Sequence, residues 1–175
     1  IDNGSELPKI ESTNKKIISE ETAYQMTSIL QGTVERGTAK KLRSLKVPLA
    51  GKTGTTNDNF DAWFIGFSSN LVIGVYIGYD VPKTLGKNET GSKAALPIFK
   101  NFVENALFKE DFNDFNIPEK IYLTSINYDT GKKSAIGDKN SIIEALKIED
   151  INNINNKNLI STVGNDKIIK FRQFY

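Results

Sequence analysis

Hydrophobic residues recur at helical spacing in the segment that follows Ser19. Ser19 is a favourable N-cap residue, and the acidic Glu20 and Glu21 suit the positive end of a helix. The pattern predicts an amphipathic helix that stops near Gly37, with a short basic helical turn over residues 40–45. Its apolar stripe consists of Ala23, Met26, Ile29, Leu30 and Val34.

The pattern changes to extended structure between Val47 and Asp80. Three segments indicate strands, VPLAGKTG, DAWFIGFSS and LVIGVYIGYD, and the last two are typical of a hairpin. Apolar residues occupy alternating and intervening positions in the hairpin, so we expect its strands to be buried on both faces. Strand propensity is weakened at Gly66, Gly74 and Gly78, which predicts that another element packs closely there.

A second amphipathic helix is predicted over residues 97–108, where it would cover the sheet. Pro97 fits near its start, or at a kink if the helix begins at Ser92. Its apolar stripe consists of Ile98, Phe99, Phe102, Val103, Ala106 and Leu107.

The chain beyond residue 117 predicts a small appendage, so we expect one unit over residues 1–117 and another over residues 118–175. The segment KIYLTSINYDTGKKS indicates a strand, a turn around Gly131 and a weak return strand. We interpret NSIIEALKIED as a short helix, the Asn-rich tail INNINNKN as a linker, and DKIIKFRQFY as a last docked strand.

The composition restricts the chemistry. The chain has no Cys and no His, which removes thiolate catalysis, disulfides, histidine triads and nearly every transition-metal site. Proton transfer near neutral pH must then use Lys, Tyr, a carboxylate or a Ser-Lys pair. The formal charge is +2, so no nucleic-acid partner is expected. The sequence has no apolar run of bilayer length and no signal pattern, and its start at Ile1 predicts a processed or truncated piece.

The segment LAGKTGTTND, residues 49–58, has two chemical interpretations. A phosphate-binding P-loop needs glycine where Lys46 stands, and better helix formers than Gly54 and Thr55 after its lysine. A Lys-Thr-Gly strand would instead line a serine acyl-transfer cleft, with Lys52 as a positive charge and the hydroxyls of Thr53 and Thr55 for a carboxylate. Gly54 would let substrate approach the backbone, and the Thr55 N–H would face an oxyanion.

Longer matches favour the second interpretation. RGTA at residues 36–39, AGKTGTTND, DAWFIGF and ETGSKAALPIF together closely resemble the transpeptidase domain of class A penicillin-binding proteins, the bifunctional peptidoglycan synthases. The resemblance runs from about Ile18 to Leu107 and continues more weakly to SIIEALK. It implies an α+β fold, related to serine β-lactamases, in which an antiparallel sheet is sandwiched by helices. Residues 1–117 would be the C-terminal half of that domain, so the fold would be incomplete.

The resemblance also implies roles for individual residues. Lys52 and Thr55 would be catalytic. Thr53, Gly54 and Thr55 would bind the terminal carboxylate of a D-Ala-D-Ala stem peptide or of a β-lactam. No cofactor and no metal are expected.

The nucleophile of the family lies in a Ser-x-x-Lys motif, which we expect to precede this chain. Ser12 to Lys15 matches that motif and Ser68 to Asn70 matches the accompanying Ser-x-Asn motif. We reject both matches, because the first lies in a polar stretch without an apolar stripe and the second in a predicted turn. We therefore expect no nucleophile in this chain, and no catalysis by the chain alone.

The resemblance implies partners and a location as well. The N-terminal half of the same protein would pair with the strand at Leu71–Tyr79, which otherwise has an open edge. The location would be the outer, periplasmic face of the bacterial inner membrane, reached through an anchor outside this chain. Two alternatives remain: a serine β-lactamase or D,D-carboxypeptidase fragment, or a non-catalytic remnant that acts as a binding module.

Overall fold

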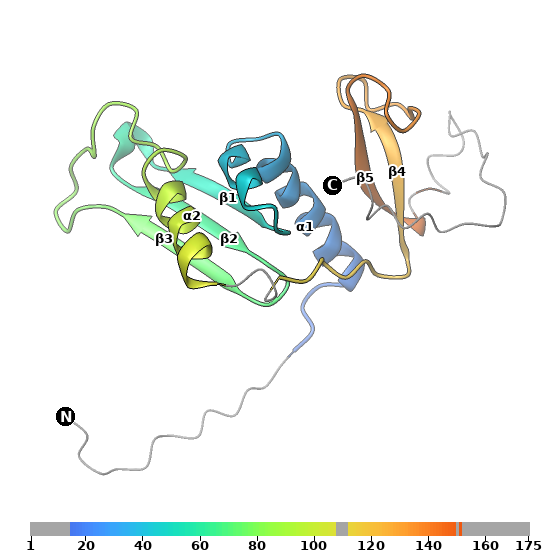
Figure 1. Ribbon diagram of the computed structural model, residues 1–175, viewed down its shortest axis with the longest axis horizontal. Coiled ribbons are helices and arrows are strands. Elements are labelled where there is room, and N and C mark those ends of the chain that lie inside the picture. Colours follow the sequence, from blue (N-terminus) through green and yellow to red (C-terminus); the bar gives the residue numbers. More distant parts are fainter. Residues whose placement is uncertain (1–14, 108–111, 150, 152–175) are drawn as a thin grey trace, which may run out of the picture.

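The structure is a computed structural model that describes residues 15–107, 112–149 and 151 (Figure 1). Helices and strands follow one another along the chain in the order α1 (Glu20–Glu35), the 3-10 helix η1 (Lys40–Leu45), β1 (Ala50–Thr55), the 3-10 helix η2 (Asn57–Asn59), β2 (Ala62–Phe67), β3 (Val72–Ile77), α2 (Ala95–Ala106), β4 (Ile121–Asn127) and β5 (Ser141–Lys147). Within these ranges, no helix is long and apolar enough to cross a bilayer.

The strands form two antiparallel sheets. The larger sheet has the order β1-β2-β3, and the smaller one pairs β4 with β5. In the larger sheet Gly54 lies opposite Trp63, which lies opposite Tyr76. The predicted β2–β3 hairpin is confirmed, and its turn is closed by the Ser68 N–H, which donates to the Leu71 carbonyl at 2.9 Å. The fold is therefore α+β, as predicted, and β1 and β3 are the edges of the larger sheet in the described chain.

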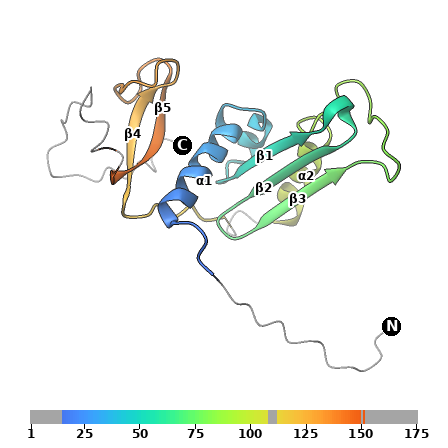
Figure 2. The same ribbon diagram turned by 180° about the vertical axis from the view of Figure 1, so that it is seen from behind.

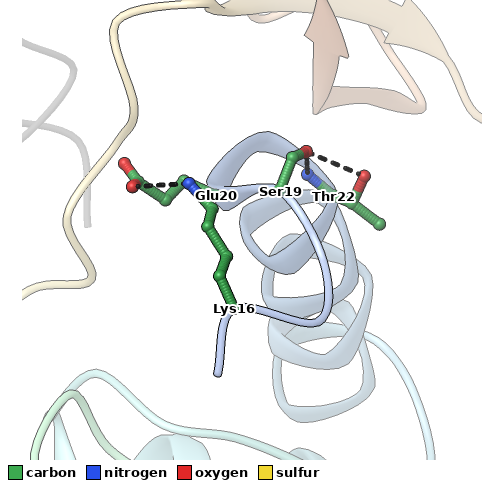
Figure 3. Close-up of polar contacts among 4 residues, drawn as sticks. All are labelled: Lys16, Ser19, Glu20 and Thr22. Carbon is green, nitrogen blue, oxygen red and sulfur yellow. Dashed lines mark hydrogen bonds and ion pairs between the residues drawn. The ribbon is translucent and has the colours of Figure 1, made fainter. Parts of the chain in front are cut away.

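The start of α1 follows from its cap. The Ser19 hydroxyl oxygen accepts a hydrogen bond from the Thr22 N–H at 3.2 Å, as predicted for an N-cap (Figure 3). Figure 3 also shows the ion pair between Lys16 and Glu20, whose atoms are 3.2 Å apart. Both of its side chains are exposed, so it contributes little to stability.

We expect Ser19→Ala to lower the free energy of unfolding by about 1 kcal/mol at pH 7, because a first-turn N–H loses its acceptor. The hydrogen bond from Ser19 also holds the pKa of the Glu21 carboxyl below its ordinary value of 4.5. That contribution is present above pH 4.5 and is lost as the pH falls below it, so the deficit should narrow at pH 3. Urea unfolding at both pH values measures it.

The matched control is Thr27→Ala in the middle of α1. Its hydroxyl donates to the Ala23 carbonyl at 3.0 Å, a bond made within an already formed helix. Alanine is the better helix former, so no loss is expected. Equal losses for the two variants would contradict a capping role for Ser19.

The core lies between one face of the larger sheet and the two helices. Phe64 and Phe99 are fully buried, and their rings meet edge to face at 4.8 Å. Gly66 makes this contact possible, because a Cβ there would lie 2.6 Å from the Phe99 ring. The remaining buried members are Val34, Ala39, Leu42, Leu49, Ala95, Leu96 and Val103. The prediction that an element packs closely at Gly66 is confirmed.

The prediction that the hairpin is buried on both faces is wrong for the described chain. Trp63, Ile65 and Tyr76 share the face opposite Phe64, and their side chains are 41%, 49% and 50% exposed. A Cβ at Gly74 on this face would meet nothing within 4 Å, so the prediction that an element packs closely there is wrong for the described chain. Seen from behind, β2 and β3 lie in front of α2, and no described helix covers them (Figure 2). The apolar side chains on this face have no cover because both helices lie on the other face.

The apolar stripe predicted for α2 is also partly wrong. Ile98 and Phe102 are exposed, whereas Leu96 joins Phe99 and Val103 in the core. Residues 96, 99 and 103 follow the three-and-four spacing of one helix face, and Ile98 and Phe102 lie beside that face.

The segment predicted as a short helix is strand β5. All seven of its residues pair with β4, from Ser141 opposite Asn127 to Lys147 opposite Ile121. Short apolar segments such as SIIEALK are ambiguous by periodicity, and pairing with β4 decides the outcome. The predicted return strand near residue 133 contributes a single bridge, between Ile126 and Lys133. Most of the Asn-rich tail, the docked strand and Ser12 lie outside the described residues.

The smaller sheet contacts α1 (Figure 1). The Gln25 side-chain amide donates to the Ala145 carbonyl of β5 at 3.1 Å. Arg36 lies 3.6 Å from Glu144 in an ion pair. These contacts fix β5 against the helix that also borders β1.

Candidate active site

The unpaired edge of β1 carries the backbone groups of every second residue. In an antiparallel pair, the N–H and C=O of one residue point to the same side, and those of the next residue to the other side. The Gly51 carbonyl accepts a hydrogen bond from the Thr33 hydroxyl, and the Thr53 carbonyl accepts one from Lys52 Nζ at 2.8 Å. Both carbonyls face away from β2, so by alternation the Thr55 N–H faces the unpaired edge too.

Lys52 and Thr53 converge at this edge. The exposed Lys52 side chain places its Nζ 3.5 Å from the Thr53 hydroxyl, besides its bond to the Thr53 carbonyl. The Thr53 hydroxyl is also 3.1 Å from the hydroxyl of Thr38, in the turn after α1. A cation and two hydroxyl groups therefore lie together beside an exposed strand edge.

Thr38 is a site residue that the sequence did not assign. It belongs to the RGTA segment, which contributed to the family resemblance without a role for its threonine. Thr38 and Thr53 are 15 residues apart, so their contact depends on how α1 packs against β1. The one sequence feature that could have pointed to Thr38 is its place directly after the predicted helix stop at Gly37.

Gly54 and Thr55 lie at the end of β1, about 3.4 Å and about 7 Å beyond Thr53 at the usual rise of a strand. Thr55 is exposed, and its hydroxyl oxygen accepts a hydrogen bond from the Gly91 N–H at 3.0 Å. A Cβ at Gly54 would lie 3.1 Å from the Cβ of Trp63 on the next strand. Gly54 is thus explained by close packing against Trp63 on the uncovered face.

The turn after Thr55 is held in place by Asp61. The Asp61 N–H donates to the Thr56 hydroxyl at 2.8 Å, and the Thr56 N–H donates to the Asp61 carbonyl at 3.1 Å. The Tyr76 hydroxyl donates to the Asp61 carboxylate at 2.9 Å, which raises the pKa of Tyr76 above its usual value. Tyr76 also packs against Trp63, with ring centroids 4.6 Å apart. The end of β1 is therefore fixed relative to β2 and β3.

The Ser68 side chain is hydrogen-bonded within the β2–β3 turn. Its oxygen accepts hydrogen bonds from the N–H groups of Asn70 and Leu71, and it lies at the opposite end of β2 from Trp63. This confirms the turn interpretation of Ser68 to Asn70. Among the described residues, no group of three or more acidic side chains is arranged to hold a metal ion.

Comparisons with known proteins identify the family of the chain. A profile of the penicillin binding protein transpeptidase domain matches residues 7–104. The chain therefore belongs to the penicillin-binding protein transpeptidase family. The relatives found among curated proteins bear out the resemblance to class A members, since they carry the name Penicillin-binding protein 1A.

Penicillin-binding protein 1A of Rickettsia felis is 39% identical over 89% of this chain, and that of Pseudomonas aeruginosa is 42% identical over 78% of it. The chain spans 19% and 17% of the length of these two relatives. The crystal structure of penicillin-binding protein 1A from Haemophilus influenzae matches with a TM-score of 0.63 and 32% identity. That match covers 73% of this chain and 20% of the other.

Proposed function

We propose that the chain forms the carboxylate-binding wall of a serine D,D-transpeptidase that cross-links peptidoglycan stem peptides and is acylated by penicillin. The observation that carries the proposal is the convergence of the Lys52 ammonium and the Thr53 hydroxyl at the unpaired edge of β1, with Thr55 exposed beyond them. A cation and hydroxyl donors are the groups that a peptide carboxylate binds. Lys52 and Thr55 take the catalytic roles, and Thr53, Gly54 and Thr55 contact the substrate.

The reaction proceeds in two steps through an acyl-enzyme. A serine outside this chain attacks the carbonyl of the penultimate D-Ala, the peptide C–N bond breaks, and the terminal D-Ala leaves with the serine proton. An amine of a neighbouring stem peptide then attacks the ester, forms the cross-link and returns a proton to the serine. The Thr55 N–H stabilises the oxyanion in both steps. Lys52 attracts the substrate carboxylate and favours the neutral form of a nearby lysine base.

The proposal includes the N-terminal half of the same protein as the source of the serine. The exposed apolar face of Trp63, Ile65 and Tyr76 and the unpaired edge of β3 support a partner there. Residues 1–117 then belong to the transpeptidase domain, and residues 118–175 form an appendage to it. We place the protein at the periplasmic face of the bacterial inner membrane, held by an anchor outside this chain, with no cofactor and no nucleic-acid partner.

Intact-mass spectrometry after incubation with benzylpenicillin tests the proposal. We expect the complete protein that carries this chain to gain the mass of one penicillin molecule, and the 175 residues alone to gain none. An adduct that persists for hours favours the transpeptidase over a β-lactamase, whereas rapid loss of the adduct to water favours a β-lactamase.

Two other outcomes would overturn parts of the proposal. If the complete protein gains no mass, the chain belongs to a non-catalytic binding module. If the 175 residues gain the adduct alone, the nucleophile lies within them, and Ser12 becomes the first candidate.

A further inference from the structure

The loop between β3 and α2 crosses the end of the Lys-Thr-Gly strand at Gly91. Gly91 is buried, and its N–H donates to the Thr55 hydroxyl oxygen at 3.0 Å. The Gly91 carbonyl accepts a hydrogen bond from the Leu96 N–H in the first turn of α2 at 2.8 Å. Gly91 thus connects the start of a core helix to a side chain of the proposed substrate site.

The bond from Gly91 restricts what the Thr55 hydroxyl can do. A hydroxyl has one hydrogen to donate and two lone pairs that accept. The Gly91 N–H occupies a lone pair, and within the described ranges no acceptor takes the hydrogen of Thr55. The hydrogen of the Thr55 hydroxyl is therefore free to be donated to a ligand that binds beside the exposed Thr55. A carboxylate only accepts hydrogen bonds, so it is the complementary ligand.

Only glycine fits at position 91. A Cβ there would lie 2.4 Å from the Trp63 carbonyl oxygen, 2.6 Å from the Gly54 carbonyl oxygen and 3.2 Å from the Gly54 nitrogen. Gly54 and Trp63 are opposite each other in the β1–β2 pair, so these atoms belong to a backbone that cannot yield without disturbing the sheet. Any side chain at this position must lift the loop and draw the Gly91 N–H away from Thr55.

We propose that Gly91 is a positioning residue, whose N–H orients the Thr55 hydroxyl as a hydrogen-bond donor to the substrate carboxylate. This inference rests on the proposed function of the Lys-Thr-Gly strand. It makes the β3–α2 loop part of the substrate site, although the loop itself donates nothing to the substrate. Gly91 thus acts on the substrate carboxylate only indirectly, through the Thr55 hydroxyl that it orients.

A double-mutant cycle in the complete protein tests this, with the second-order rate of acylation by benzylpenicillin as the readout. Gly91→Ala is expected to lower the rate about tenfold to a hundredfold, the range for one hydrogen bond to a charged group. In the Thr55→Val background, Gly91→Ala should cost less than about threefold, because the hydroxyl it orients is absent. Equal losses in the two backgrounds, or no loss in either, would overturn the inference.

Ser92→Ala is the matched control in the same loop. It removes the contact between the Ser92 and Thr90 hydroxyls at 3.0 Å and leaves Gly91 in place, so the acylation rate should stay unchanged. A loss as large as that of Gly91→Ala would mean that general loop disorder explains the effect, and would overturn the inference.

Hydrogen exchange of the Gly91 amide gives a second measurement that needs no activity and no substitution at Gly91. Residue-resolved mass spectrometry should show faster exchange in Thr55→Val than in Thr55→Ser, which keeps the acceptor. Equal exchange in the two variants would overturn the inference. The two variants can differ in Gly91 exchange as expected while the wild type is not acylated by penicillin. In that case the Gly91–Thr55 hydrogen bond stands, but the proposed function fails, and the role of Gly91 toward a carboxylate fails with it.

Discussion

Lys52→Ala is expected to slow the acylation of the complete protein by benzylpenicillin at least about a hundredfold, equivalent to about 2.7 kcal/mol. The ammonium lies 2.8 Å from the Thr53 carbonyl and 3.5 Å from its hydroxyl, at the edge where the carboxylate is proposed to bind. Its removal deletes a charged hydrogen bond to the carboxylate and the cation that holds Thr53 in place. Time-resolved intact-mass spectrometry measures the rate.

The control for Lys52→Ala is Lys41→Ala, which removes an equal charge from an exposed position on helix η1. Its rate should match the wild type, because Lys41 is exposed and its charge is screened by water and salt. Lys52→Arg is expected to recover only part of the rate, since the planar guanidinium cannot take the place of a compact ammonium. If Lys52→Ala reacted as fast as Lys41→Ala, the edge of β1 would not be the carboxylate site.

The β2–β3 hairpin and the capped helix were predictable because their signals are local. Ser19 and the two glutamates after it specify the start of α1, and the Ser-Asn turn between two apolar runs specifies the hairpin. β5 was not predictable, because SIIEALK has similar helix and strand propensities and only pairing with β4 selects the strand. The exposure of Trp63 and Ile65 was not predictable either, because the sequence shows that a residue is apolar but not whether another element covers it.

The candidate site also contains residues that the sequence predicts and residues that it does not. Lys52, Thr53, Gly54 and Thr55 are consecutive, so a motif places them on one strand edge without knowledge of the fold. Thr38 and Gly91 reach that strand from 15 and 36 residues away, and each does so through a single hydrogen bond. No spacing in the sequence encodes such contacts. They follow from how α1 and the β3–α2 loop pack onto β1, so the sequence alone does not reveal the contact of Gly91 with Thr55.

Phe99→Ala is expected to lower the free energy of unfolding by about 3–5 kcal/mol, the range for deleting a buried aromatic ring. Phe99 is fully buried, meets Phe64 edge to face at 4.8 Å, and fills the space that Gly66 leaves open. Its loss leaves a cavity between α2 and β2 that backbone atoms cannot close, because both elements are hydrogen-bonded along their length. Urea denaturation of the complete protein, followed by hydrogen exchange of peptides from β2 and α2, measures the effect and locates it.

Phe102→Ala is the matched control on the same helix, one turn further along. Its side chain is 45% exposed and lies outside the core, so a loss below about 1 kcal/mol is expected. Equal losses for Phe99 and Phe102 would mean that a partner covers the outer side of α2 as tightly as the sheet covers its inner side. The difference between the two variants thus decides whether α2 is held by this chain's own sheet, which in turn holds Gly91 against the Lys-Thr-Gly strand.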